Sequence, residues 1–168
     1  MNKFSIQTVH ARRVWDSRGV PTVEAEVTLR FGAQGRAIAP AGASIGSEEM
    51  AELRDHGEAF GGRDVMGAVS AIKTEIGPIL KGIDVREQAK IDNLMIELDG
   101  TKNCSRVGGN AIIATSMAVL NAAAAAEKLP LWRYLAQIQG NSEAKTLPLP
   151  EIQIFGGVAH AAGRIDIQ

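Results

Sequence analysis

The sequence has a single cysteine, almost no net charge and no signal-peptide core. Cys104 has no second cysteine with which to form an intramolecular disulfide, which favours a reducing compartment, the cytoplasm. A net charge of −1 makes nucleic acid and membrane surfaces poor partners. The alanine run at 122–126 is far too short to span a bilayer. These features predict a cytoplasmic protein that binds neither nucleic acid nor membranes.

Three segments near the N-terminus show the two-residue period of half-buried strands. Apolar residues alternate roughly over 4–14 and cleanly over 23–31, and a third strand is expected at about 36–39. Turn residues at 16–21 and 31–35 separate the three segments. Because such short connections join antiparallel neighbours, the sequence predicts a three-stranded antiparallel meander.

A stretch of small residues, 39–49, follows the third predicted strand and precedes helical sequence. Glycines at 42 and 46 flank a serine at 44, so the backbone can approach a ligand closely. The Lys and Ser/Thr that follow the last glycine of a phosphate-binding P-loop are missing. We therefore interpret the stretch as a mobile active-site loop of another kind.

Beyond residue 64 the apolar period lengthens to about 3.6, which predicts helices. Asp64 is expected to cap the first helix and Pro78 to kink or end it. Its apolar stripe is Val65, Val69, Ile72, Ile76 and Ile79. Asp84 and Glu87 stand at capping-box spacing before a second helix, which Asp99-Gly100 ends.

Two further helices complete a first domain, residues 1–140. Asn110 is expected to cap an alanine-rich helix that is narrow enough for close packing. Its inward side is predicted to carry Ile112, Ile113, Met117, Leu120 and Ala124. Pro130 opens a short last helix that Gly140 ends. Residues 141–168 are a polar linker, an extended segment and strand-like sequence, the expected entrance to a second domain.

Short motifs relate the chain to one family by their order and spacing. They are Ala11-Arg12, Asp16-Ser17-Arg18-Gly19, Pro21-Thr22-Val23-Glu24, the loop at 40–46, Glu52-Leu53-Arg54-Asp55, Leu98-Asp99-Gly100-Thr101, Asn110-Ala111-Ile112, Leu147-Pro148, His160-Ala161 and Gln168. Each motif alone is weak, but together they cover nearly the whole chain. The sequence resembles the N-terminal portion of enolase, the glycolytic phosphopyruvate hydratase.

The resemblance implies an α+β domain, a three-stranded antiparallel meander followed by a helical bundle, and then a β/α barrel. A barrel needs roughly 250 residues, so residues 141–168 would hold only the linker and the first segment of a truncated barrel. The intact protein would be a homodimeric Mg²⁺-dependent hydro-lyase that interconverts 2-phosphoglycerate and phosphoenolpyruvate. The present chain alone is expected to be inactive, because the family's catalytic base and metal carboxylates lie in the rest of the barrel.

The resemblance also implies roles for individual residues. Ser44 matches the loop serine that gives oxygen ligands to a second Mg²⁺ as the loop closes, and its loop neighbours are Ala41, Gly42, Ala43, Ile45 and Gly46. His160 and Gln168 match substrate-binding positions. From residue chemistry alone, Ser44 could instead hydrogen-bond within a turn, and His160 could be structural. Arg12 and Glu24 match positions near the family's dimer interface, or pair across strands.

Other polar residues are weaker candidates for a site. Glu48 and Glu49 are consecutive, so their side chains diverge, and a solvated surface fits them better than a metal site. His10 and His56 have no partners at ligand spacing, and Cys104 has no evident base beside it. We expect all of these to be structural or inert.

Departures from the family pattern leave alternatives open. Ala41 and Ile45 stand where serine and threonine are usual, and 153–159 (Gln-Ile-Phe-Gly-Gly-Val-Ala) replaces an asparagine-rich stretch before the histidine. One alternative is a paralogue that acts on another phosphoenolpyruvate-like acid or on a phosphonate. The other is a non-catalytic module that supplies a capping or dimerisation surface.

Overall fold

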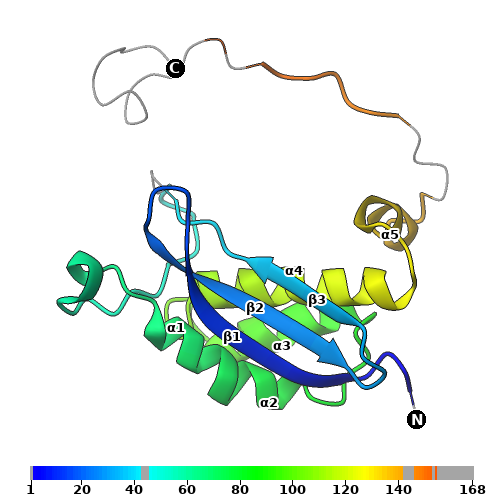
Figure 1. Cartoon of the computed structure of the whole chain (residues 1–168), viewed down its shortest axis with the longest axis horizontal. Helices are drawn as coiled ribbons and strands as arrows, with labels where there is room; N and C mark the ends of the chain where they lie inside the picture. The colour runs from blue at the N-terminus through cyan, green and yellow to red at the C-terminus, as the bar shows by residue number, and fades with distance from the viewer. Residues whose placement is uncertain (1, 43–45, 142–145, 153, 155–168) are drawn as a thin grey trace.

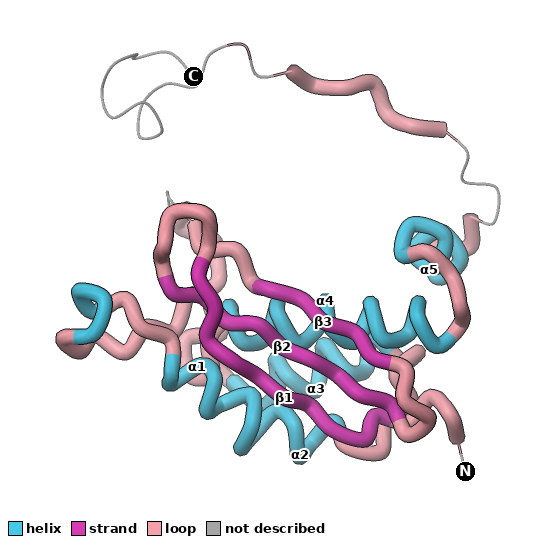
Figure 2. The backbone as a smooth tube through the Cα atoms, viewed as in Figure 1, coloured by secondary structure: helices cyan, strands magenta, loops and turns pink. Residues whose placement is uncertain are grey.

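A computed structural model describes residues 2–42, 46–141, 146–152 and 154. Its described part is an α+β domain in which a three-stranded antiparallel sheet is followed by helices (Figure 1). The predicted fold class is therefore confirmed. The helices α1, α2, α3 and α4 lie on one face of the sheet and leave the other face open (Figure 2).

The sheet is a meander with the order β1-β2-β3. Its strands are β1 (Ile6–Trp15), β2 (Pro21–Leu29) and β3 (Gln34–Ile38). The central strand β2 is buried along nearly its whole length, because it has a neighbour on each side and helices against one face. The alternation of apolar residues over 23–31 thus located the central strand, as its two-residue period predicts. The strand ends at Leu29, and Phe31 lies exposed in the following turn instead of in the strand.

Within the described residues, the helical half contains four α-helical regions, one of which is interrupted by a π-helical turn, and one short 3₁₀ turn. The first region comprises α1 (Met66–Ala71), a π-helical turn η2 (Ile72–Ile76) and α2 (Gly77–Leu80). It is followed by α3 (Gln88–Asp99), α4 (Gly109–Ala126) and α5 (Leu131–Ile138). A single 3₁₀ turn, η1 (Ala59–Gly62), precedes α1. Pro78 is the second residue of α2, and the helical region ends two residues later.

Helix α4 packs on the sheet at very short range. A Cβ atom built on Gly35 of β3 would lie 2.0 Å from the Ala122 nitrogen and 2.2 Å from the Ala118 carbonyl oxygen. Small side chains on both elements permit this approach, as the alanine-rich sequence predicts. Helix α4 is long and apolar enough to cross a membrane, but most of it is buried inside the fold, so its apolar character serves packing.

The predicted inward side of α4 is partly wrong. Ile113 and Met117 are 40% and 44% exposed, although Ile112 and Ala124 are buried. The alanines at 111, 114, 118 and 122 are fully buried instead. Because the helix approaches Gly35 so closely, only small side chains fit at that contact, and Ile113 and Met117 are turned outward.

The predicted helix caps are also wrong in detail. The first N–H groups of α1, those of Met66 and Gly67, donate to Asp55 at 2.8 Å each, whereas Asp64 accepts from Val65 and Arg13. Helix α4 begins at Gly109 after an N-cap at Gly108, so Asn110 lies inside the first turn. Asp84 accepts from the Arg86 backbone in a local turn, and no side chain caps α3.

Candidate functional site

A hollow of about 670 Å³ lies between the loop after β3 and the start of α4. We call residues 39–49 the small-residue loop and residues 50–56 the strap. The hollow is bounded by Pro40, Gly42 and Gly46 of the loop, Glu52 and Arg54 of the strap, and Asn110 of α4. Both glycines of the loop that the sequence singled out therefore border one concave surface.

The stem of the small-residue loop is held from two sides. The Arg18 Nη2 atom donates to the Ala41 carbonyl at 2.7 Å, and the Gly42 N–H donates to Glu52 Oε1 at 3.1 Å. Arg18 is itself paired with Asp16 at 2.9 Å. Hydrogen bonds from the Val20 N–H and from Arg18 hold the pKa of Asp16 below its usual range, so this carboxylate stays ionised at neutral pH. Arg18 and Glu52 thus hold the stem of the loop at Ala41 and Gly42.

Arg54 organises the strap below the loop. Its Nη2 and Nε atoms donate to Glu52 Oε2 at 2.7 and 3.1 Å, and its Nη1 atom donates to the Pro21 and Arg63 carbonyls at 2.6 and 2.7 Å. The Arg54 side chain is only 13% exposed. A planar guanidinium can satisfy this fork of acceptors, whereas an ammonium group cannot. Arg54 therefore fixes Glu52, which in turn binds the Gly42 N–H.

The strap is also attached to the first turn of α4. The Gly109 N–H donates to the Ala51 carbonyl at 2.7 Å, and the Ala51 N–H donates to the Asn103 carbonyl at 2.8 Å. Asn110 accepts from the Leu53 N–H at 3.1 Å and donates to the Leu53 carbonyl at 3.2 Å. These bonds satisfy backbone groups that would otherwise be left unpaired beside a helix start. They make the floor of the hollow continuous with the helical core.

Three of the predicted loop residues are described by the structure, namely Ala41, Gly42 and Gly46. The residues Ala43, Ser44, Ile45, His160 and Gln168 lie outside the described residues, and so does the segment 155–159. Sequence reasoning assigned no role to Arg18, Glu52 or Arg54, and it gave Asn110 only that of a helix cap. Each of them stands within one of the motifs that carry the family resemblance, which is the signal that could have singled them out.

The described residues alone do not form a magnesium site. Within 2–42, 46–141, 146–152 and 154, no group of three or more His, Cys, Asp or Glu side chains is placed to hold a metal ion. Glu49 and Glu52 border the hollow, but Glu52 is engaged by Arg54 and by Gly42. We therefore derive no chemical step through a metal from these residues.

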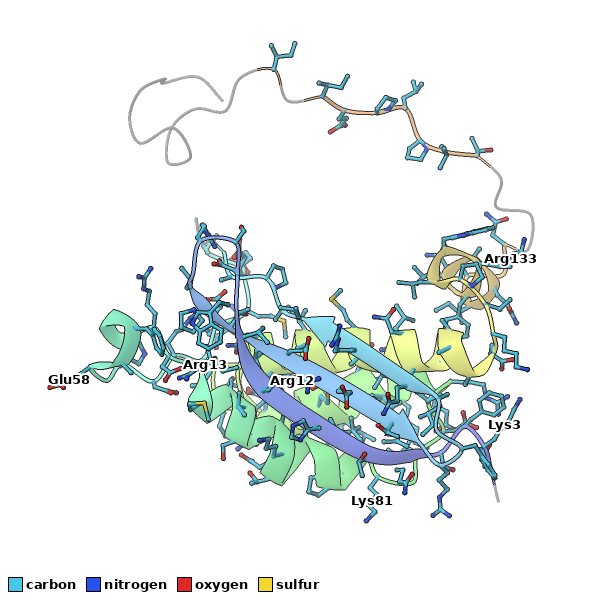
Figure 3. All side chains as sticks on the ribbon, viewed as in Figure 1. Lys3, Arg12, Arg13, Glu58, Lys81 and Arg133 are labelled. Atoms are coloured by element: carbon cyan, nitrogen blue, oxygen red, sulfur yellow. The ribbon has the colours of Figure 1, made fainter. Side chains whose placement is uncertain are left out.

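The open face of the sheet carries an ion-pair network. Arg12, which is labelled in Figure 3, pairs with Glu24, and at 2.7 Å with Glu26. Arg36 lies 3.3 Å from Glu24. These pairs across the strand face are one of the two roles that the sequence left open for Arg12 and Glu24.

Cys104 lies elsewhere in the domain. Burial and the nearby Asp99 raise the pKa of its thiol, so this cysteine is a poor nucleophile.

Comparison with known proteins places the chain in a family. The model of the enolase N-terminal domain matches residues 6–135. The chain is 49% identical over 168 residues to Enolase 1 of Desulfitobacterium hafniense (strain Y51), which covers 100% of the chain and 38% of that protein. It is 49% identical over 164 residues to Enolase 1 of Lactococcus lactis subsp. cremoris (strain SK11), covering 98% of the chain and 38% of that protein.

The chain thus spans only about 38% of the length of these relatives. The match begins with β1 and ends within α5, so it covers the whole sheet, the loop and the helices that form the hollow. The chain belongs to the enolase family, of which it contains the N-terminal domain.

Proposed function

We propose that the chain is the N-terminal part of a hydro-lyase that interconverts 2-phosphoglycerate and phosphoenolpyruvate in glycolysis. The observation that carries the proposal is the braced loop stem beside the hollow, in a domain of this family. The loop is proposed to act as a flap over a substrate site that the rest of the intact protein completes. The substrate is accordingly a small phosphorylated carboxylic acid.

The proposed reaction removes a proton next to a carboxylate and expels hydroxide from the neighbouring carbon. The proposal includes Mg²⁺, which in the intact protein would offset the negative charge that develops on the carboxylate. Ser44 is proposed as a metal ligand of the flap, and His160 and Gln168 as substrate-binding residues; all three rest on the family resemblance. No residue of this chain is proposed as the catalytic base.

The contribution of the described residues is to position the flap. Arg18 and Glu52 hold the two consecutive residues Ala41 and Gly42, so a flap that moves beyond them would pivot from a fixed stem. Since Arg54 holds Glu52, the support extends to the start of β2 through the Pro21 carbonyl. A stem fixed in this way limits the positions that the flap can reach, which favours one closed geometry.

The proposal has consequences for organisation. Residues 1–140 are proposed as a capping domain and 141–168 as the linker and first segment of a β/α barrel. The isolated chain would lack turnover, because the proton-abstracting base would lie outside it. The intact protein is proposed to be a cytoplasmic homodimer without nucleic-acid or membrane partners.

A chimera tests the proposed function. Residues 1–168 are joined to the corresponding remainder of the Desulfitobacterium hafniense relative, and phosphoenolpyruvate formation from 2-phosphoglycerate is followed by absorbance with and without Mg²⁺. We expect Mg²⁺-dependent turnover by the chimera and none by the isolated chain. A folded chimera without turnover, or substantial turnover by the isolated chain, would contradict the proposal.

The role of Ser44 is tested within the same chimera. Ser44→Ala should lower kcat at least about tenfold, which corresponds to about 1.4 kcal/mol of activation free energy. Ser47→Ala is the matched control, since Ser47 is an exposed serine of the same loop to which the proposal gives no ligand role. Equal effects of the two substitutions would remove the special role of Ser44.

A second candidate is a paralogue that acts on another phosphoenolpyruvate-like or phosphonate acid. The residues that favour it are Ala41 and Ile45, which lack the usual hydroxyl groups of the loop. Restoring them with Ala41→Ser and Ile45→Thr discriminates the two functions. An increase in 2-phosphoglycerate turnover at the expense of another acid favours the paralogue, and an unchanged preference favours enolase.

A further inference from the structure

A second hollow lies at the other end of β3 from the small-residue loop. It has a volume of about 530 Å³ and is lined by Ile6, Gln7, Thr8, Arg30, Phe31 and Lys81. We call it the bulge pocket. The turn that carries Phe31 precedes β3, whereas the small-residue loop follows it, so the turn and the loop lie at opposite ends of this strand (Figure 1). The bulge pocket is thus distinct from the site of the proposed function.

The pocket is built on an irregularity of the edge strand β1. Ile6 pairs with Leu29 and Thr8 with Thr28, so Gln7 is an extra residue opposite β2. Such a bulge bends the strand and changes the direction of its side chains, and bulges are over-represented next to functional sites. The exposed Gln7 amide and Thr8 hydroxyl therefore stand at a bend that supplies hydrogen-bonding groups to the pocket.

The segment that carries Lys81 is fixed against the same strand. The Gly82 N–H donates to the Ile6 carbonyl and the Ile6 N–H donates to the Ile83 carbonyl, each at 2.9 Å. Lys81 immediately precedes this pairing and projects outward beside the sheet (Figure 3). On the opposite wall, the Arg30 N–H donates to the Ser5 carbonyl at 3.1 Å. Hydrogen bonds thus fix the backbone at Arg30 and the backbone next to Lys81 beside the pocket.

The charged residues among the described lining of the pocket are both cationic. Arg30 and Lys81 line it, and none of the described lining residues is an Asp or Glu. The chain as a whole has a net charge of −1, so this positive surface is local. A guanidinium and an ammonium on one concave surface favour a phosphate group, to which they give charge-assisted hydrogen bonds.

An aromatic ring adds a second recognition element. Phe31 is 69% exposed at the wall of the pocket, although leaving a large apolar side chain in water costs free energy relative to burying it. Its turn is closed by hydrogen bonds from the Gly32 N–H to the Leu29 carbonyl at 2.9 Å and from the Leu29 N–H to the Ala33 carbonyl at 2.8 Å. An exposed ring on this closed turn offers a face for stacking with a planar ligand.

We propose that the bulge pocket binds a small ligand that carries both a phosphate group and a planar ring, the chemistry of a mononucleotide. Lys81 and Arg30 contact the phosphate, Gln7 and Thr8 donate hydrogen bonds, and Phe31 stacks with the ring. This site is independent of the flap and of the proposed lyase activity. It gives the domain a ligand of its own at the far end of the sheet.

Calorimetric titration of the 168-residue chain with adenosine monophosphate tests the proposal, with adenosine and inorganic phosphate as separate arms. Adenosine monophosphate should bind more tightly than either part, and added salt should weaken it because the phosphate contacts are exposed. Lys81→Gln should weaken binding about tenfold and Phe31→Ala at least about fivefold. Unfolding midpoints confirm that each variant remains folded.

Two control variants make the result specific. Lys73→Gln removes an exposed lysine and Trp132→Ala removes an exposed aromatic ring, both outside the pocket. Neither should change the affinity for adenosine monophosphate. The proposal is overturned by absence of binding in the millimolar range, by adenosine or inorganic phosphate binding as tightly as the nucleotide, or by equal losses in the control variants.

Discussion

Asn110 and Leu53 exchange two hydrogen bonds across 57 positions of the chain. The Asn110 carbonyl oxygen accepts from the Leu53 N–H, and its amide nitrogen donates to the Leu53 carbonyl. One side chain thereby serves as a backbone partner for the strap, in the way that a neighbouring strand would. Asn110 is only 5% exposed, so water cannot replace these bonds. Asn110 thus attaches the strap to α4 together with the hydrogen bond from the Gly109 N–H to the Ala51 carbonyl.

We expect Asn110→Ala to lower the free energy of unfolding by about 2 kcal/mol, because it leaves the partly buried N–H and carbonyl groups of Leu53 without their partner. Urea denaturation measures the change. Asn121→Ala is the control, since Asn121 donates a single hydrogen bond, to the Arg36 carbonyl at 3.1 Å, from an exposed position. Equal losses in the two variants would show that the two hydrogen bonds between Asn110 and Leu53 stabilise the fold no more than one exposed hydrogen bond does.

Gly35→Ala should be among the most destabilising single substitutions in the domain. Its Cβ atom would overlap the backbone of α4 at Ala118 and Ala122, which cannot move without displacing the helix. We expect a loss of about 3 kcal/mol or more in urea denaturation. Gly57→Ala is the control, because nothing lies within 4 Å of its added Cβ. A small effect at Gly35 would mean that α4 can shift away from the sheet.

Arg54→Lys should loosen the stem of the small-residue loop as well as destabilise the domain. A lysine cannot reproduce the contacts with Glu52, Pro21 and Arg63, so we expect a loss of about 1.5–3 kcal/mol. Because Glu52 is then held less firmly, hydrogen exchange of the Gly42 N–H should become faster than in the parent chain. Arg133→Lys, at an exposed arginine on α5, should change neither quantity. An unchanged exchange rate of the Gly42 N–H would show that Arg54 does not help to hold the stem of the loop.

Asp99 should make stability depend on pH in the acid range. Burial raises the pKa of this carboxyl, but hydrogen bonds from Thr101, Val107 and Arg106 outweigh burial and hold the pKa below its usual range. The unfolded chain therefore takes up the proton more readily, and the stabilisation present above about pH 4 is lost as the pH falls through the lower, folded-state pKa.

Urea midpoints measured from about pH 7 to about pH 3 test this expectation. Asp99→Asn should be less stable at neutral pH and should lose less of its stability on acidification than the parent chain. Part of the pH dependence should remain, because the pKa of Asp16 and of Asp64 is lowered too. Parallel pH profiles for parent and variant would show that Asp99 does not contribute.

The sheet could be predicted from the sequence because its signal is local. A two-residue period fixes which side chains of 23–29 face the helices, and short turns leave one way to pair the strands. The order of helices follows from the change of period, with Pro130 and Gly140 bounding the last one as expected. These features depend on neighbours within a few positions.

The helix caps and the orientation of α4 could not be predicted, because distant residues decide them. Asp55 caps α1 from eleven and twelve positions away, whereas sequence reasoning chose the adjacent Asp64. Helix α4 is apolar on nearly all sides, so periodicity does not tell which side is buried. The missing side chain at Gly35 settles it in favour of the alanines.

The candidate site likewise has one part that could be predicted from the sequence and one part that could not. The small-residue loop is visible in the sequence because small residues are unusual in such number. Its supports are not, because an arginine side chain can reach many acceptors and spacing does not select among them. Arg18 reaches Ala41 across 23 positions, and Arg54 joins a strand, a turn and the strap. The role of such residues becomes apparent only when the chain is folded.

The π-helical turn at Ile72–Ile76 gives the domain one residue of spare length. A π turn accommodates one residue more than the α-helix that would replace it. A chain shortened by one residue here could close the segment as a regular helix, with Leu80 still directed into the core. The same deletion in α4 would rotate every alanine after it away from Gly35. The domain can therefore change length beside α2 but not beneath the sheet.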